Sequence, residues 1–166
     1  MKKINAISLI FRRADNGIYA AEVIFGVALT LVMVIAVFLQ VIFRYIINNP
    51  LAWSEELSRY VFVWVSMIGA SIGMKKKAHY GLDALYRIFP EKQRRAVEIS
   101  VYSLISIFLL VLVYYGILWS KEIYLQKAPG LEISMAIPYA AIPAGSLLML
   151  MHILLMPFAK SGGEDV

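Results

Sequence analysis

The sequence predicts an all-α integral membrane protein with four transmembrane helices and short amphipathic helices at the membrane surface. Hydrophobic residues make up 61% of the chain and charged residues 16%, and the mean hydropathy is +0.73. These values are far from those of a soluble protein. Four apolar runs are long enough to cross a hydrocarbon core of about 30 Å. The 166 residues therefore suffice for one membrane domain, residues 1–166, without a separate soluble domain.

Two features of the composition exclude whole classes of function. The chain has no cysteine, which excludes disulfides, thiolate metal sites and cysteine nucleophiles. The isoelectric point near 9.4 reflects basic residues that gather beside the apolar runs, where such residues set membrane topology. We therefore expect no nucleic-acid partner.

The first predicted span runs from Ile18 to Phe43, and only Glu22 and Gln40 interrupt its apolar character. Its 26 residues cross the bilayer with some tilt at about 1.5 Å per residue. Ahead of it, apolar residues recur at helical spacing among basic residues, which favours a surface helix in the headgroup region over a partly ordered tail. These apolar residues are Ile4, Ile7 and Phe11.

The second span is unusual because its uncharged part, residues 60–74, would be only about 22 Å long as a helix. Asn49 is a favoured N-cap residue and Pro50 a favoured first helical residue, so we predict one helix from Pro50 to Met74. This helix carries Glu55, Glu56 and Arg59 close to the membrane surface. The arginine lies four residues after the first acid, at a spacing that lets the two charges partly neutralise each other. The residues leave two interpretations open, a buried polar contact or a solvated first turn.

The third span is predicted over residues 96–119, and a continued apolar pattern leaves open an extension to Leu125. Pro129 and Gly130 mark the turn that follows. The fourth span is predicted over residues 136–159. Pro143 lies inside it and should kink the helix unless the helix starts later, because proline cannot donate the backbone hydrogen bond.

Lysine and arginine are distributed unequally between the two sides of the predicted membrane. Twelve lie in the N-terminal tail, the loop of residues 75–95 and the C-terminal tail, and four lie on the other side. This bias predicts that both termini are cytoplasmic and that the segment around Glu55 lies at the outer face. The middle loop carries apolar residues at helical spacing, Leu82, Leu85, Ile88 and Phe89, which predict a short surface helix.

Few polar residues are placed to do chemistry, so no enzyme activity is predicted. Glu22 is a candidate transport carboxylate, but it lies near the cytoplasmic end, where it can reach headgroups or basic residues of the tail. His79 and His152 are too isolated along the sequence to indicate a metal pair. A row of small residues in the second span predicts close packing of another helix. These residues are Gly69, Ala70, Ser71 and Gly73.

Several segments in order along the chain resemble one transporter family. They are QVIFRY (residues 40–45), WSEELSRYVFVW (53–64), Gly69-Ala70, His79 with Leu82-Asp83 ahead of Pro90, and SMAIPYAAIPAG (134–145). Together they resemble the small membrane subunit, or Q subunit, of tripartite ATP-independent periplasmic (TRAP) transporters. The chain ends after the fourth span, which is similar to an unfused small subunit.

The resemblance implies a sodium-coupled secondary transport system of the bacterial inner membrane. A periplasmic binding protein would deliver a small carboxylate, such as sialic acid or a C4-dicarboxylate, to a large membrane subunit that holds the substrate and sodium sites. This chain would be the scaffold in the lipid membrane, binding neither substrate nor cofactor. The resemblance further implies contacts to partner chains, or a polar network, at the periplasmic face. The residues concerned are Arg44, Trp53, Glu55, Glu56 and Arg59.

One alternative from another class remains. Four helices and an acid in the first span, Glu22, also suit a small proton-coupled multidrug exporter that works as a homodimer. The long loop of residues 75–95 and the amphipathic start of the second span are features that such a minimal exporter does not need.

Overall fold

The structure is a computed structural model that describes residues 6–77 and 91–160, and for residues 6–9, 77, 91–92 and 156–160 it describes the backbone alone. Four long helices run alternately up and down: α1 (Ala6–Tyr45), α2 (Ala52–Lys77), α4 (Glu91–Glu122) and α6 (Ala141–Lys160), with a short α5 (Ala136–Tyr139) ahead of the last. All four are long and apolar enough to cross a membrane, which confirms the predicted fold class by length and composition. The predicted surface helix around Leu82 to Phe89 lies outside the described residues.

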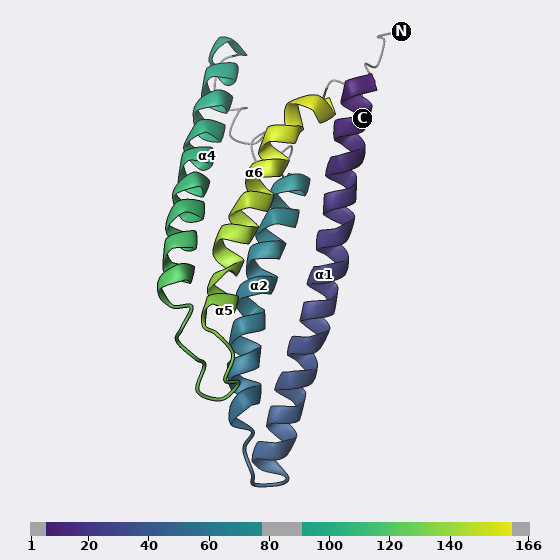
Figure 1. The fold of residues 1–166 in the computed structure, drawn as a ribbon. Helices are drawn as coiled ribbons and strands as arrows, with labels where there is room; N and C mark the ends of the chain where they lie inside the picture. The colour runs from purple at the N-terminus through teal and green to yellow at the C-terminus, as the bar shows by residue number, and fades with distance from the viewer. Residues whose placement is uncertain (1–5, 78–90, 161–166) are drawn as a thin grey trace.

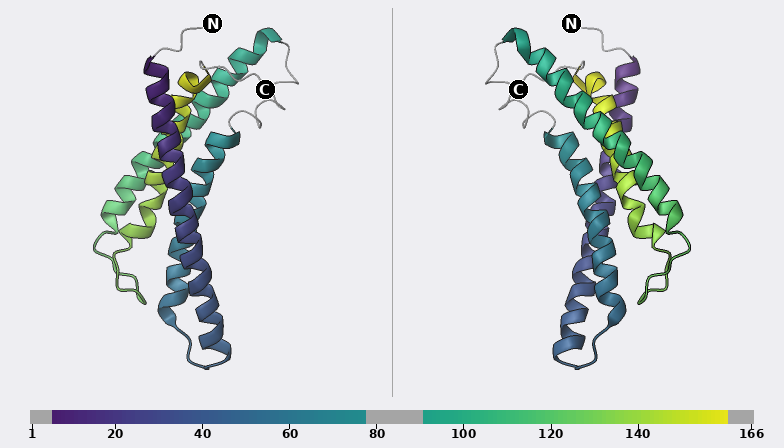
Figure 2. Two further views of the ribbon diagram at one scale, coloured as in Figure 1. Left: turned by 90° about the vertical axis from the view of Figure 1, so that its right-hand side faces the viewer. Right: turned by 90° about the vertical axis from the view of Figure 1, so that its left-hand side faces the viewer.

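Helices α2 and α6 lie in the middle of the bundle, with α1 on one side and α4 on the other (Figure 1). Within the described residues, α1 and α4 do not touch each other, and α4 packs only on α5 and α6. Figure 2 shows the α1–α2 pair inclined to the α4–α6 pair, so that the two pairs diverge toward the end that carries the connections of residues 46–51 and 123–135. We call this the loop end, and the end where α1 begins and α6 finishes the terminal end.

The first helix is longer than predicted. It is continuous from Ala6, whereas the sequence predicted a separate surface helix before a span beginning at Ile18. That prediction is wrong for the described residues, because nothing between the two segments breaks the helix and Asp15 is held by contacts from two other helices. The segment predicted to lie at the membrane surface and the first span therefore form one continuous helix.

The second helix begins later and ends later than predicted. It starts at Ala52 and continues through Lys77. Asn49 and Pro50 precede it and do not cap it; the first turn is instead closed by Ser54, whose amide and hydroxyl both donate to the carbonyl of Leu51, at 3.2 and 2.8 Å. The third span ends at Glu122, so the proposed extension to Leu125 is not helical.

The fourth span is divided near the predicted proline, because its long helix starts later than predicted, at Ala141. The helix is interrupted at Ala140, between α5 and α6, three residues before Pro143. Proline has no N–H to donate to the carbonyl of Tyr139, four residues earlier, and this missing bond accounts for the break. The ring of Pro143 packs against α4 at Gly116, where a Cβ atom would lie 2.8 Å from the proline Cδ.

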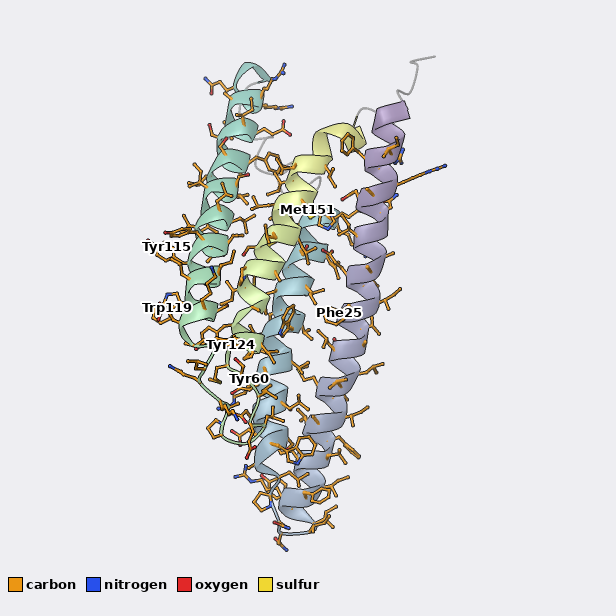
Figure 3. All side chains as sticks on the ribbon, viewed as in Figure 1. Phe25, Tyr60, Tyr115, Trp119, Tyr124 and Met151 are labelled. Carbon is orange, nitrogen blue, oxygen red and sulfur yellow. The ribbon has the colours of Figure 1, made fainter. Side chains whose placement is uncertain are left out.

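The core is small and lies along α6. Leu109, Met149 and Leu150 are buried together, with partly buried side chains from α2 and α4 around them. Large apolar side chains on the outer faces remain exposed, and Figure 3 shows Tyr115 and Trp119 pointing away from the bundle, with exposed fractions of 55% and 61%. Such faces are suited to lipid or to other membrane helices.

Candidate functional site

At the loop end, one carboxylate binds three donors. Glu56 is 5% exposed, and its Oε2 atom accepts hydrogen bonds from the amides of Gly130 and Leu131, both 2.8 Å long. Its Oε1 atom accepts the hydroxyl of Tyr60 at 2.8 Å, and that hydroxyl also lies 3.0 Å from the sulfur of Met135. Figure 3 places Tyr60 on α2 close to this loop. We call these five residues the Glu56 clamp, which fastens the start of α2 to the loop between α4 and α5.

The loop is shaped to present those amides. An antiparallel bridge joins Lys127 to Ser134, and the backbone of Glu132 has a φ of 55°. Pro129 and Gly130 lie in the turn, as predicted. A Cβ atom on Gly130 would lie 2.9 Å from Oε2 of Glu56 and 3.3 Å from the carbonyl of Ala52. The close approach of the carboxylate therefore requires glycine at this position.

The other residues predicted for this face are exposed. They are Arg44, Trp53, Glu55 and Arg59. Within the part of the chain that the structure describes, no ion pair joins Glu55 to Arg59, so the predicted mutual neutralisation is not a direct contact. Arg59 instead lines a cavity of about 460 Å³ together with Glu56 and Tyr60. The two adjacent acids thus have different environments. Glu56 is buried and hydrogen-bonded within the chain, whereas Glu55 is exposed to solvent or to a partner.

Toward the terminal end, a second polar group joins three helices. His152 on α6 places Nδ1 2.6 Å from Oδ1 of Asp15 and Nε2 3.2 Å from Oε2 of Glu22, both on α1. On α2, Ser71 donates to Oε1 of Glu22 at 2.8 Å, and Nζ of Lys75 lies 3.0 Å from Oδ2 of Asp15. We call these five residues the terminal cluster.

Four members of the terminal cluster are buried, and each of its two acids has hydrogen-bonding partners from the other helices. Relative exposures are 8% for Asp15, 4% for Glu22, 4% for His152 and 0% for Ser71. Burying an ionised group is costly unless opposite charge or hydrogen bonds compensate it. Removing one member would leave its neighbours without that compensation, so the cluster specifies how α1, α2 and α6 dock.

The structure corrects one expectation about this region and adds contacts to two others. Glu22 does not reach headgroups or the tail but contacts Ser71 and His152. Ser71 is a hydrogen-bond donor as well as a small packing residue. His152 is not isolated, because α6 returns to the end where α1 begins. The sequence did contain a signal for this cluster. Glu22, Ser71 and His152 lie in three different spans at a similar depth from the same membrane face. His79 lies outside the described residues.

The small residues of α2 do not pack as a group inside this chain. A Cβ atom on Gly69 or Gly73 would meet no atom within 4 Å, so the predicted close approach is not made there by any described residue. Close packing occurs at other glycines. A Cβ atom on Gly145 would lie 2.7 Å from Cβ of Met67, and one on Gly26 would lie 3.3 Å from Cγ2 of Ile68. The exposed face with Gly69 and Gly73 remains a predicted contact for another helix.

The fold and the two polar groups define a class of protein: a small four-helix membrane subunit whose buried polar residues hold helices together. Among the described residues, no group of three or more acidic or histidine side chains is arranged to hold a metal ion. Residues 33–159 match the model of the family described as tripartite ATP-independent periplasmic transporters, DctQ component. The chain belongs to this family, which is a family of transporter subunits and not of enzymes.

Relatives agree with this assignment. The sialic acid TRAP transporter permease protein SiaT of Haemophilus influenzae (strain 86-028NP) is 31% identical over 111 residues, 67% of this chain and 18% of the relative. The C4-dicarboxylate small permease protein DctQ of Vibrio cholerae is 33% identical over 75 residues, 45% of this chain and 30% of the relative. A TRAP small permease protein of H. influenzae (strain Rd) is 31% identical over 110 residues, 66% of this chain and 67% of the relative.

The chain therefore spans less than a third of the length of the first two relatives, SiaT and the Vibrio protein. Its four spanning helices and its family place it in the bacterial inner membrane as a multi-pass protein.

Proposed function

We propose that this chain is the scaffold subunit of a sodium-coupled TRAP transporter. In this assignment a large membrane subunit moves substrate and sodium, and the present chain holds it in the membrane. A periplasmic binding protein delivers the substrate, a small carboxylate of the kind for which SiaT and DctQ are named. The family supplies the transporter class, and the scaffold role is inferred from how the polar residues are used.

The observation that carries the proposal is that the buried acids form their contacts within this chain. Asp15, Glu22 and Glu56, the acids that are buried among the described residues, all contact groups of this same chain. A subunit that itself bound sodium would need acids free to coordinate the ion, whereas Glu56 is already bound by three donors of this chain, and Asp15 and Glu22 are held by Lys75, Ser71 and His152. Groups committed to holding helices are suited to a rigid support.

The surfaces left for partners lie on different sides of the bundle. At the loop end, exposed Trp53, Glu55 and Arg59 form a polar rim suited to the binding protein or to outer loops of the large subunit. Along α2, Gly69 and Gly73 offer a flat face on which a partner helix can pack closely. Apolar faces of α1 and α4 are available to lipid.

The alternative of a proton-coupled exporter is set aside because the chain belongs to the DctQ family. Its candidate carboxylate, Glu22, is buried at 4% exposure and is already bound by Ser71 and His152. An exporter carboxylate has to exchange protons with a substrate pathway, which this position does not open onto.

The proposal is tested by coexpressing the chain with a large TRAP membrane subunit and purifying through a tag on the chain. We expect the large subunit to copurify, and we expect carboxylate uptake in proteoliposomes to need the chain, the large subunit, the binding protein and a sodium gradient. Failure of the large subunit to copurify, together with uptake that is unchanged when the chain is omitted, would refute the scaffold role.

A matched pair of variants tests the predicted helix contact. In Gly69→Leu/Gly73→Leu, the isolated chain should remain helical and folded, because both positions are open within the chain. Recovery of the large subunit should fall several-fold, because the new side chains hold the partner helix away. Ala20→Leu, at an exposed position of α1, is the control for added apolar bulk. Equal recovery for all three proteins would show that the partner packs elsewhere.

A further inference from the structure

The ring of His152 lies between two carboxylates, one on each nitrogen. Nδ1 is 2.6 Å from Asp15 and Nε2 is 3.2 Å from Glu22, and the histidine side chain is 2% exposed. A neutral imidazole has one N–H donor and one lone pair, whereas an ionised carboxylate only accepts. A neutral ring would therefore point its lone pair at a carboxylate oxygen. Only the imidazolium donates to both acids.

The charges of the cluster lead to the same conclusion. Lys75 is the only cation in contact with the two acids among the described residues, and it contacts Asp15, with further hydrogen bonds to the Asp15 carbonyl at 2.8 Å and to Asn16 at 3.0 Å. Glu22 receives a hydrogen bond from the neutral hydroxyl of Ser71, and His152 is the only described side chain that can place a cation beside it. With a neutral ring the cluster carries one excess negative charge, and with an imidazolium its charges cancel.

No other described group supplies the missing positive charge. Lys76 is exposed and lies 5.8 Å from the ring centre of Tyr19, without an ion pair to Asp15 or Glu22 among the described residues. Arg12 and Arg13 are exposed about one turn nearer the start of α1. On α4, the residues packed against Met149 and Leu150 of α6 include the apolar pair Ile105 and Leu109. Within the part of the chain that the structure describes, the compensation therefore comes from the cluster itself.

We propose that the terminal cluster is a proton-binding site, in which His152 is held as an imidazolium between Asp15 and Glu22 at neutral pH. The bound proton fastens α6 to α1 and balances the charge of Glu22. A solvated histidine is mostly neutral at pH 7.5.

The protonation state can be read directly by nitrogen NMR. The chain has two histidines, so His79→Gln leaves His152 as the only one. With ¹⁵N-labelled histidine and the full chain in lipid nanodiscs at pH 7.5, we expect both ring nitrogens to give imidazolium signals. One protonated and one bare nitrogen, the pattern of a neutral ring, would overturn the proposal without requiring any change to the cluster.

Two further variants in the His79→Gln background separate charge from hydrogen bonding. Glu22→Gln removes the uncompensated acid, and its ring should be mostly neutral at pH 7.5. Ser71→Ala removes one hydrogen bond and no charge, so its ring should stay an imidazolium. An imidazolium that persists in Glu22→Gln would overturn the assignment of Glu22 as the group that holds the proton.

The unfolding temperature tests whether the bound proton holds α6 to α1. Between pH 7 and pH 9, the unfolding temperature of the His79→Gln chain should fall further than that of His79→Gln/Glu22→Gln, because only the former loses a bound proton. Equal pH dependence of the two proteins would show that the proton does not tie the helices together.

Discussion

Glu56 and Gly130 are in direct contact, although 74 positions separate them along the chain: the glycine amide lies 2.8 Å from Oε2 of the glutamate. The same oxygen occupies the space that a side chain at position 130 would need. The contact explains why a carboxylate is found near the membrane surface at the start of α2. It closes the loop end of the bundle, and a carboxylate is the group that can accept from two amides and a hydroxyl together.

Our first prediction separates the two adjacent acids. In Glu56→Ala, the amides of Gly130 and Leu131 lose their acceptor, and their hydrogen exchange should accelerate by roughly tenfold or more, the effect of losing a hydrogen bond to a charged group. Glu55→Ala is the matched control and should leave both amides unchanged, because Glu55 is exposed. Exchange measured on the chain in nanodiscs decides the matter, and equal rates in the two variants would contradict the clamp.

A second prediction concerns where helices approach closely. Gly145→Ala should destabilise the isolated chain by about 1–3 kcal/mol, the usual cost of adding atoms to a packed contact, because its Cβ atom would meet Met67. Gly73→Ala should be neutral or stabilising by up to about 1 kcal/mol, because alanine favours the helix and the position is open. Unfolding of both variants in detergent checks this, and a larger loss in Gly73→Ala would reverse the assignment.

The third prediction is the orientation in the membrane. The structure places the start of α1 and the finish of α6 at one end and the connection of residues 46–51 at the other. The excess of lysine and arginine on the terminal side predicts that this end is cytoplasmic. Reporter fusions at Gly163 and at Asn49 should report opposite sides, with Gly163 inside. The same side for both, or the reverse assignment, would refute it.

The fourth prediction is that Glu22 is not a transport carboxylate. Its contacts with Ser71 and His152 make it a structural residue. Substrate uptake per assembled complex with Glu22→Gln should therefore stay within a few-fold of wild type, although less complex is recovered if the bundle is weakened. Abolished uptake at equal recovery would instead assign the acid a direct role in transport.

The bundle itself was predictable because membrane insertion is governed by local properties. A run of about 20 apolar residues has to be helical in a bilayer, where backbone groups must bond within the segment. The interruption near Pro143 was predictable for the same reason, since the missing N–H belongs to the residue itself. Helix ends were less well predicted: α1 continues through Asp15 into a region that hydropathy alone assigned to a surface helix.

Within the candidate site, the sequence singled out Glu22 and Glu56 but could not assign their partners, and it assigned Ser71 only to helix packing. A buried charge requires a partner, yet the sequence does not say which of several polar residues supplies it. The predicted pair of Glu55 and Arg59 follows from spacing on one helix, whereas the observed partners of Glu56 come from a loop more than seventy positions away.

Hydropathy, proline positions and family motifs are properties of consecutive residues, so the amino-acid sequence is enough to predict a four-helix membrane subunit of the TRAP type. The contact of Glu56 with the loop at Gly130 and the position of His152 between Asp15 and Glu22 become visible only in the folded bundle. Those pairings depend on the helix that each span packs against and on its rotation about its own axis. These are set by shape complementarity at residues such as Gly145 and Gly116, where contacts of a few ångströms select one docking among many.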